Sequence, residues 1–262
     1  MNNLRITVVQ ADLHWENPTA NLAMLEEMLW TLKEPTDIIV LPEMFTTGFT
    51  MNTQQYAEVP QLTTFRWLRQ QAAQYNAVVV GSYIVKEQQQ YFNRLVWMQP
   101  DGTADFYDKK HLFRMAEEDK FFTAGSKRIV KMWKGWRICP LICYDLRFPV
   151  WSYNLDSQGA IAYDCLLYIA NFPEARATAW NSLLKARAIE NWSYCVGVNR
   201  IGIDGKGISY VGDSSVITPK GSVIFQANNE ATVQTIELDA TELLSYREKF
   251  PAYLDADRFQ LL

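Results

Sequence analysis

Cys143 lies between two stretches of opposite character, the apolar run 138–142 and the polar run 144–147. A strand that ends at a polar turn exposes the next side chain at its carboxyl edge, where the following backbone N–H groups can face a developing oxyanion. The pattern therefore makes Cys143 a candidate nucleophile and the Tyr144 N–H a candidate oxyanion donor. The alternative is a buried structural thiol, because free cysteine is among the most buried residue types.

A cysteine nucleophile needs a partner that takes its proton, because the pKa of a free thiol is about 8.5. Histidine is the usual base, but the chain has only 2 histidines, His14 in an expected early loop and His111 after two lysines. If neither serves, the base must be a carboxylate. Glu43 is the candidate, because it follows the apolar run 37–41 and ligands bind at the carboxyl edge of strands in α/β folds. A solvated turn acid is the alternative.

A cation near the thiol would stabilise its thiolate and could bind an oxyanion. Lys109 and Lys110 are the candidates, and spacing alone does not choose between them. A second carboxylate nearby would hold that lysine charged, and Glu117, Glu118 and Asp119 follow within ten residues. The alternatives are a solvated basic loop and an acidic surface turn.

The 262 residues suffice for one large domain or two small ones, and 48% hydrophobic with 21% charged residues is typical of globular proteins. A net charge of -4 argues against a general nucleic-acid binder. No run approaches the ~20 apolar residues that span a bilayer, so we expect no membrane partner. The start of the chain lacks the pattern of a secretion signal, which favours a cytoplasmic location.

In the reducing cytoplasm, cysteines are expected as free thiols. The spacing of the 4 cysteines lacks paired C-x-x-C, so a structural zinc site is not expected. Three of them fall inside apolar runs and fit a structural thiol better than a nucleophile: Cys139, Cys165 and Cys195.

Strand-like and helix-like segments alternate along the chain. The expected strands are 4–10, 37–41, 77–85, 91–99, 103–107, 136–143, 165–170, 194–199, 211–218, 222–226 and 233–238. The expected helices are 21–32, 63–75 and 179–191. Turn signals at 100–102 and 219–221 predict hairpins within this series, which favours an α/β protein with mixed β-sheets.

Three segments taken together resemble the nitrilase superfamily of carbon–nitrogen hydrolases: LPEMF (41–45), YDKKHLF (107–113) and CYDLRFP (143–149). The family has a Glu after a strand, a Lys in a K-x-H-like segment and a Cys in a C-x-D-x-R-type segment. Their order and separation agree here across about 100 residues. The match is much more specific than any one of the three motifs.

This resemblance implies roles for particular residues. It assigns Glu43 as the base, Cys143 as the nucleophile and Lys109, two residues before His111, as the catalytic lysine. It places the second glutamate at Glu118, with Glu117 as the alternative. No catalytic histidine, metal or organic cofactor is implied.

The resemblance also implies a fold and an assembly. We expect residues 1–262 to form a single domain with a four-layer α-β-β-α sandwich of two mixed β-sheets. We expect a homodimer to which a C-terminal tail, about 240–262, contributes. Within the family the chain looks most like the ω-amidases that hydrolyse 2-oxoglutaramate and 2-oxosuccinamate, on the phrases DKKHLFRMAEE, NFPEARATAW and YREKFPAYLDAD.

An ω-amide substrate carries a carboxylate, so its pocket should offer a cation or N–H donors. Arg114 and Arg176 are candidates, although either could be a structural or surface arginine. Aromatic residues are candidates to line the pocket, although aromatic residues are more often part of a core: Phe45, Phe113, Phe172 and Trp180. Asp145 and Arg147 are expected to hold the nucleophile turn or a dimer contact.

The expected reaction is attack of Cys143 on a small carboxamide, with Glu43 as the base and a thioester intermediate. The three catalytic residues alone do not exclude a nitrile or an N-carbamoyl amino acid as substrate. A non-catalytic binding or scaffold protein on the same fold is the alternative of another class. Nucleotide binding is disfavoured, because the glycines at 202–207 lack the G-x-G-x-x-G spacing and fit a hairpin loop.

Overall fold

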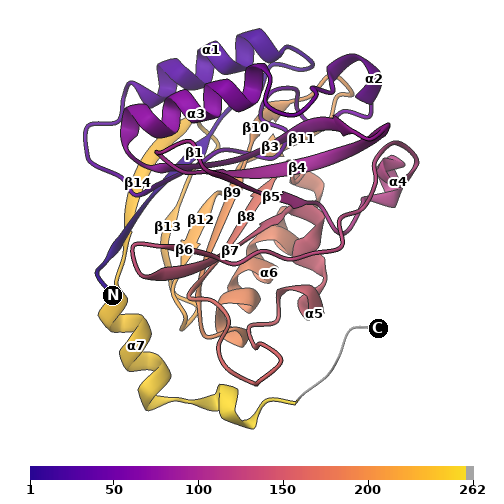
Figure 1. Ribbon diagram of the computed structural model, residues 1–262. Coiled ribbons are helices and arrows are strands. Elements are labelled where there is room, and N and C mark those ends of the chain that lie inside the picture. Colours follow the sequence, from indigo (N-terminus) through magenta and orange to yellow (C-terminus); the bar gives the residue numbers. More distant parts are fainter. Residues whose placement is uncertain (258–262) are drawn as a thin grey trace.

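The protein is built from two six-stranded β-sheets that pack against each other, with helices on the outer side of each sheet. Figure 1 shows the computed structural model, which describes residues 1–257. The expectation of an α/β fold with two mixed sheets in an α-β-β-α sandwich is confirmed. Residues 258–262, the end of the expected tail 240–262, lie outside the described residues.

The first sheet has the strand order β14-β1-β2-β3-β4-β5. Its strands are β1 (Leu4–Gln10), β2 (Ile38–Val40), β3 (Val78–Glu87), β4 (Gln90–Met98), β5 (Ala104–Asp108) and β14 (Thr232–Leu238). The central pairs β1/β2 and β2/β3 are parallel, and the other pairs are antiparallel.

The second sheet has the order β13-β12-β9-β8-β7-β6 and repeats this plan, with parallel pairs β7/β8 and β8/β9 at its centre. Its strands are β6 (Lys131–Trp133), β7 (Trp136–Ile142), β8 (Cys165–Ala170), β9 (Tyr194–Asn199), β12 (Ser215–Ile217) and β13 (Val223–Gln226). A separate hairpin, β10 (Ile201–Ile203) with β11 (Ser209–Val211), follows β9 and confirms the expected hairpin loop at 202–207.

Helices α1 (Pro18–Leu29) and α3 (Thr63–Tyr75) cover the outer face of the first sheet (Figure 1). The start of α1 follows from local chemistry, because the Asn17 side chain accepts the Ala20 N–H and a proline occupies the first turn. Leu25 and Leu29, four residues apart on one face of α1, are both fully buried. Burying such a side chain stabilises the fold by about 1.5–3 kcal/mol.

Helix α6 (Ala177–Glu190) packs on the outer face of the second sheet against β9. Gly197 makes this close approach possible, since a Cβ there would lie 2.7 Å from Trp180 and 2.5 Å from Leu184. The remaining helical segments of the described chain are α2 (Thr53–Tyr56), α4 (Glu118–Phe121), α5 (Pro149–Ser152) and α7 (Ala240–Lys249), and the short 3-10 turns η1 (Arg114–Ala116), η2 (Cys143–Arg147), η3 (Glu174–Arg176) and η4 (Ala252–Asp255).

The alternation of strand side chains divides the core into layers. On β1, Ile6 and Val8 belong to the core between the two sheets, whereas Val9 packs toward α1 and α3. Both faces of the central strands are therefore buried, which explains why they read as near-continuous apolar runs in the sequence.

Two expectations about elements are corrected. The single strand expected at 211–218 is divided between β11 and β12, because Gly212 and Asp213 have φ values of +75° and +56°, which extended backbone does not allow. The helix expected at 21–32 spans Pro18–Leu29 instead, and it begins earlier because the Asn17 side chain caps its first turn. Within residues 1–257, no helix is both long enough and apolar enough to cross a bilayer.

Candidate active site

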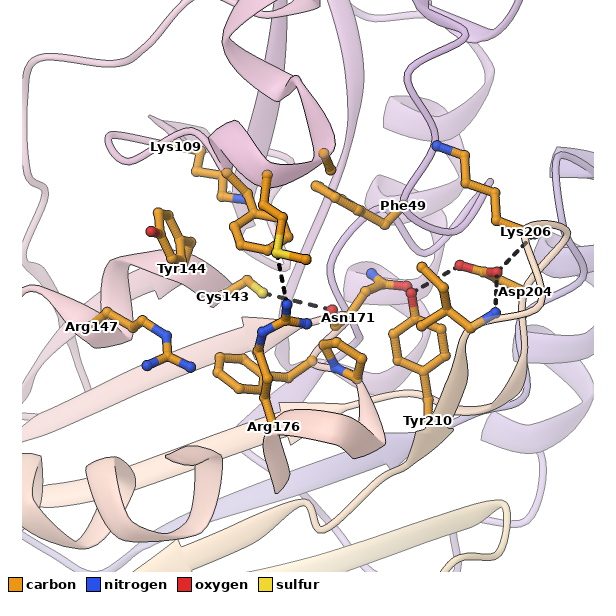
Figure 2. A pocket seen from close by; sticks show the side chains of 16 residues that line it. Phe49, Lys109, Cys143, Tyr144, Arg147, Asn171, Arg176, Asp204, Lys206 and Tyr210 are labelled. Carbon is orange, nitrogen blue, oxygen red and sulfur yellow. Dashed lines mark hydrogen bonds between the residues drawn. The ribbon is translucent and has the colours of Figure 1, made fainter. Parts of the chain in front are cut away.

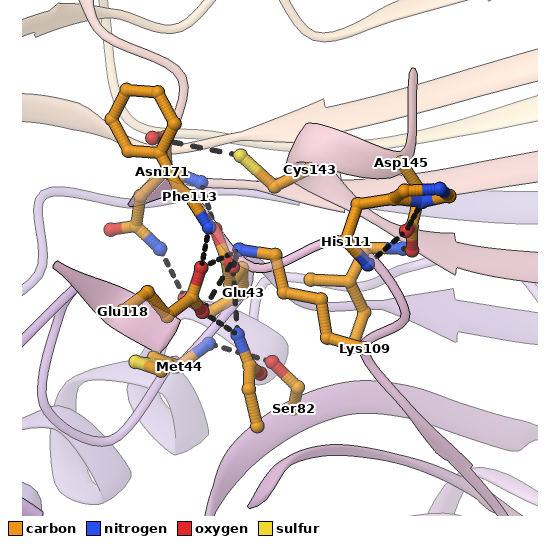
Figure 3. Close-up of polar contacts among 12 residues, drawn as sticks. Glu43, Met44, Ser82, Lys109, His111, Phe113, Glu118, Cys143, Asp145 and Asn171 are labelled. Carbon is orange, nitrogen blue, oxygen red and sulfur yellow. Dashed lines mark hydrogen bonds and ion pairs between the residues drawn. The ribbon is translucent and has the colours of Figure 1, made fainter. Parts of the chain in front are cut away.

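The carboxyl ends of strands from both sheets meet at one place in the fold. Lys109 directly follows β5 and Glu43 lies three residues after β2, both in the first sheet. Cys143 directly follows β7, and Asn171 directly follows β8, both in the second sheet. Figure 3 shows these side chains pointing toward one another. Packing of the two sheets therefore creates the site, because each sheet supplies part of it.

Cys143 has a left-handed backbone, with φ +43°. A non-glycine residue in such a conformation costs of order 1–3 kcal/mol and persists only where its surroundings enforce it. The Asp145 carboxylate does so here by accepting the Ile142 N–H at 3.0 Å. The cysteine side chain is 8% exposed, and its Sγ donates to the Asn171 carbonyl oxygen at 3.9 Å.

Asp145 also ties the nucleophile turn to the lysine segment. Its carboxylate accepts a hydrogen bond from the Tyr107 hydroxyl at 2.6 Å and from the His111 N–H at 3.0 Å. Tyr107 and His111 lie two residues before and two residues after Lys109. The His111 ring also contacts Asp145 through Nδ1 at 2.7 Å and stacks on Phe148 with centroids 3.8 Å apart. His111 is therefore engaged in holding the backbone and does not face the thiol.

Lys109 lies between two buried carboxylates. Its Nζ donates to Glu43 Oε1 at 2.9 Å and to the two carboxylate oxygens of Glu118 at 2.9 and 3.1 Å. The lysine side chain is 1% exposed, and both glutamates are fully buried. Burial opposes the ammonium charge, but Glu118 and Glu43 raise the pKa of Lys109 above its usual range. The lysine is therefore a fixed positive charge beside the thiol.

The structure brings Glu118, and not Glu117, to the lysine. Glu118 is further fixed by the Phe113 N–H, which donates to its carboxylate at 2.6 Å. Burial raises the pKa of Glu118, and the charge of Lys109 opposes that rise. Glu117 has a left-handed backbone, points to the surface and pairs with Lys120.

Glu43 accepts hydrogen bonds on both of its carboxylate oxygens. Besides Lys109, the Asn93 side-chain amide donates to Oε1 at 2.8 Å, and the Asn171 backbone N–H donates to Oε2 at 2.9 Å. Burial, and then the negative charge of Glu43, raise the pKa of the Cys143 thiol well above its usual range, against the opposing effect of Lys109. The raised pKa favours the protonated thiol at neutral pH, so Cys143 would have to give up its proton before it could act as a nucleophile.

A cavity of about 300 Å³ opens above the thiol. It is lined by Phe49, Lys109, Phe113, Met115, Ala116, Cys143, Tyr144, Arg147, Asn171, Phe172, Pro173, Arg176, Asp204, Lys206, Ile208 and Tyr210. Figure 2 shows Arg147 and Arg176 on one side of the cavity and Lys206 on the other. The walls are thus largely apolar, with cationic side chains at several points, and they suit a small molecule that carries a negative charge.

Of the expected substrate-binding residues, Phe113, Phe172 and Arg176 line the cavity. Arg114 does not, because its side chain is 85% exposed and pairs with Asp119. Tyr144, the expected source of the oxyanion N–H, also lies on the cavity wall.

Phe45 and Trp180 lie in the hydrophobic core and not on the cavity wall. Phe45 is fully buried, with its ring 5.8 Å from that of Trp67, and occupies space that the absence of a side chain at Gly81 leaves open. Trp180 is 1% exposed, and its indole N–H donates to the Asp213 carbonyl oxygen at 2.9 Å.

Sequence reasoning overlooked several residues of the site. Asn171 follows a buried strand directly, as Cys143 does, so the same signal could have found it. Asn93 lies within β4, where nothing distinguishes it from any other strand asparagine. Phe49, whose ring centroid lies 4.9 Å from the Lys109 Nζ, and Tyr210 come from segments without a recognised pattern.

The arrangement is suited to acid–base and thiol chemistry. Among residues 1–257, no group of three or more His, Cys, Asp or Glu side chains is placed to hold a metal ion. The two acids of the site instead share one ammonium group beside a thiol. Such a set can deliver a nucleophile, a proton acceptor and a stabiliser of negative charge to one carbonyl group.

Comparison with known proteins shows similarity over nearly the whole chain. The Carbon-nitrogen hydrolase family matches residues 5–248. "Omega-amidase YafV" of Escherichia coli strain K12 is 46% identical over 262 residues, covering 100% of both chains. "2-oxoglutaramate amidase" of Bacillus subtilis strain 168 is 30% identical and covers 95% of this chain and 96% of its own. The crystal structure of XC1258 from Xanthomonas campestris superposes with a TM-score of 0.97 at 41% identity, over 100% of each chain.

Proposed function

The chain belongs to the carbon–nitrogen hydrolase family, and on that premise we propose that it is a thiol-dependent ω-amidase. The proposed reaction converts the terminal amide of 2-oxoglutaramate or 2-oxosuccinamate to the acid and ammonia. The observation that carries the proposal is the buried Glu43–Lys109–Glu118 cluster beside the Cys143 thiol at the base of the cavity. The names of the full-length relatives support the substrate class.

In the first half of the reaction, Glu43 accepts the thiol proton as the Cys143 sulfur bonds to the amide carbon. The carbonyl π electrons move to oxygen, and the Lys109 ammonium and the Tyr144 N–H stabilise that oxyanion. Losing one such donor typically costs about 2.7–4 kcal/mol of transition-state stabilisation. Glu43 then gives its proton to the amide nitrogen, the C–N bond breaks and ammonia leaves a thioester on the cysteine.

In the second half, Glu43 accepts a proton from water as the water oxygen attacks the thioester carbon. Collapse of this second tetrahedral species breaks the C–S bond, and Glu43 returns the proton to the Cys143 sulfur. The products are the free acid and the resting thiol, so protons and electrons balance. Glu118 keeps Lys109 charged and in place throughout.

The arginines on the cavity wall support an anionic substrate. The guanidinium groups of Arg147 and Arg176 lie 5.7 and 5.4 Å from the ring centroids of Phe172 and Phe113. Arg176 also donates to the thioether of Met115 at 2.9 Å, and a thioether is a weak acceptor. Neither arginine has a carboxylate partner among the described residues, so both are available to the substrate carboxylate.

A substrate panel tests the proposal. Purified enzyme is supplied separately with 2-oxoglutaramate, 2-oxosuccinamate, glutamine, a simple nitrile and an N-carbamoyl amino acid. Ammonia release with the highest kcat/KM for the two oxo-acid amides is the expected result. Carbon dioxide from the carbamoyl compound, or turnover of the nitrile alone, would favour the corresponding alternative. No turnover of any compound would favour a binding or scaffold protein.

The proposal includes a homodimer of single-domain chains, 1–262, that works in the cytoplasm. In Figure 1 the chain after β14 continues through α7, which buries Leu243 in the core and pairs Arg247 with Asp164. This segment exposes Leu244, Phe250 and Leu254 by 52%, 55% and 70%, as expected if a second copy covers them. The four cysteines are free and buried, in keeping with a reducing compartment. Sedimentation of the full chain and of a variant with Leu244, Phe250 and Leu254 changed to serine tests the role of the tail, because these side chains are exposed and the buried residues of α7 are kept.

A further inference from the structure

Asn171 contacts both the proposed base and the proposed nucleophile. Its backbone N–H donates to Glu43 Oε2 at 2.9 Å, and its side-chain Nδ2 donates to the Glu43 carbonyl oxygen. Its own carbonyl oxygen accepts the Cys143 thiol at 3.9 Å. Figure 3 shows Asn171 beside both residues, with dashed lines from it to Glu43 and to Cys143. The residue is 4% exposed, so water has little access to these contacts.

We propose that Asn171 is a positioning residue that sets the Glu43 carboxylate against the Cys143 thiol, and that its side-chain amide is required for this. The inference rests on the proposed function, in that it concerns the same proton transfer. Asn171 itself does not exchange a proton or touch the reacting carbon.

The two bonds to Glu43 fix the junction between the sheets. Glu43 follows β2 of the first sheet, whereas Asn171 and Cys143 follow strands of the second. The distance between base and thiol therefore depends on how the two sheets are joined at this point. One bond from Asn171 holds the carboxylate, and the other holds the backbone that carries it, so both position and orientation are restrained.

The side chain of Asn171 is poorly suited to a purely stabilising role. Its Oδ1 is buried and has no hydrogen-bond partner among the described residues. A buried acceptor without a partner costs free energy, so stability alone does not favour an asparagine here. What the side chain does supply is the Nδ2 donor to the Glu43 carbonyl oxygen. An aspartate has nearly the same shape but, when ionised, offers only acceptors and would repel that oxygen.

The positioning matters because proton transfer needs the base within about 2.6–3.2 Å of the proton donor. In the resting enzyme the thiol is directed at the Asn171 carbonyl oxygen, and the proton must pass from there to Glu43. A misplacement of about 1 Å at such a step typically lowers the rate by about 10²-fold.

The test compares Asn171→Ala and Asn171→Asp with the wild type, using ammonia release from the best amide of the panel. We expect kcat to fall by about 10²-fold in both variants, with KM little changed, because neither substitution touches the arginines that face the substrate. The ratio of Asn171→Asp to wild-type kcat should rise as the pH falls. A protonated carboxyl group can donate to the Glu43 carbonyl oxygen, as the amide does.

Asn154 provides the matched control. It is also a fully buried asparagine whose side chain holds backbone groups, with Nδ2 donating to the carbonyl oxygens of Tyr163 at 2.9 Å and Asn191 at 2.6 Å, away from the cavity. Asn154→Ala and Asn154→Asp should lower the midpoint of thermal unfolding, while the pH dependence of kcat keeps the wild-type shape.

A kcat within about twofold of the wild type for folded Asn171→Ala would overturn the proposal. A pH-independent Asn171→Asp ratio would do the same. If one of the two variants does not fold, the kcat of the other tests the proposal, and Asn171→Ser is available as a third variant. Loss of the folded state in all three would make Asn171 a structural residue and would also overturn the proposal. A wild-type enzyme that releases no ammonia from any amide would refute the proposed function instead.

Discussion

Replacing Lys109 by methionine should weaken the fold in a pH-dependent way. Lys109→Met keeps the length of the side chain but removes the one cation that lies between Glu43 and Glu118. Breaking a buried ion pair typically costs about 3–5 kcal/mol, because an uncompensated charge stays buried. With both carboxylates fully buried, a loss of free energy of unfolding of about that size is expected at pH 7.

The direction of the pH dependence follows from Glu118. Burial already raises its pKa, and Lys109 opposes that rise, so removing the lysine raises the pKa further. An acid whose pKa is higher in the folded than in the unfolded state destabilises the fold progressively as the pH rises above its unfolded value of about 4.3. In the wild type the raised pKa of Lys109 contributes stability that is fully present below its unfolded pKa of about 10.4, so this contribution is constant between pH 5 and pH 7. The difference between wild type and variant should therefore be larger at pH 7 than at pH 5.

Urea unfolding at pH 5 and pH 7 measures both quantities. The double variant Lys109→Met/Glu118→Gln should regain part of the loss at pH 7, because one buried carboxylate is gone. Lys120→Met is the surface control, since Lys120 pairs with exposed Glu117, and its unfolding midpoint should match the wild type. A loss below about 1 kcal/mol at pH 7, or a loss of equal size at both pH values, would refute the electrostatic reasoning.

Two further predictions concern the thiol and the substrate carboxylate. Burial and Glu43 raise the pKa of Cys143, so its alkylation by iodoacetamide in the absence of substrate should be slower at pH 7 than that of a free thiol. The alkylation rate should still increase above pH 9. A rate that reaches a plateau near pH 8.5 would contradict the raised pKa. Arg176→Met should raise KM for 2-oxoglutaramate about tenfold or more, because a hydrogen bond to a charged group contributes about 1.5–3 kcal/mol. KM for an uncharged amide such as butyramide should not change. Equal effects on both substrates would mean that Arg176 only packs against the cavity wall and does not bind the carboxylate.

The strand pattern was enough to predict which side chains come first at the carboxyl edges. Cys143 and Glu43 each follow an apolar run, and such a run predicts a buried strand in either of the two sheets. The resemblance to the nitrilase superfamily identifies Lys109 as the catalytic lysine, whereas spacing alone does not distinguish Lys109 from Lys110. What the pattern could not predict was the contact between the sheets, and therefore Asn171 and Asn93 were overlooked.

The aromatic residues show a different limit. Phe45 follows a strand and Phe172 follows another, yet the first lies in the core and the second on the cavity wall. The difference lies in the neighbouring strand β3, because Gly81 has no side chain and leaves room for the Phe45 ring. A Cβ atom at residue 81 would lie 2.7 Å from that ring. A glycine within a buried strand was the available signal, but only the register between strands shows which side chain fills its space.

The most direct test of the account is to look for the acyl group on the sulfur. Excess enzyme is mixed with 2-oxoglutaramate and quenched in acid within the first turnover, and its peptides are analysed by mass spectrometry. We expect the mass of the acyl group on the peptide that contains Cys139 and Cys143, with fragmentation placing it on Cys143. Ammonia released in the same sample without an acyl group on that residue, or with one on any other side chain, would contradict the thioester mechanism.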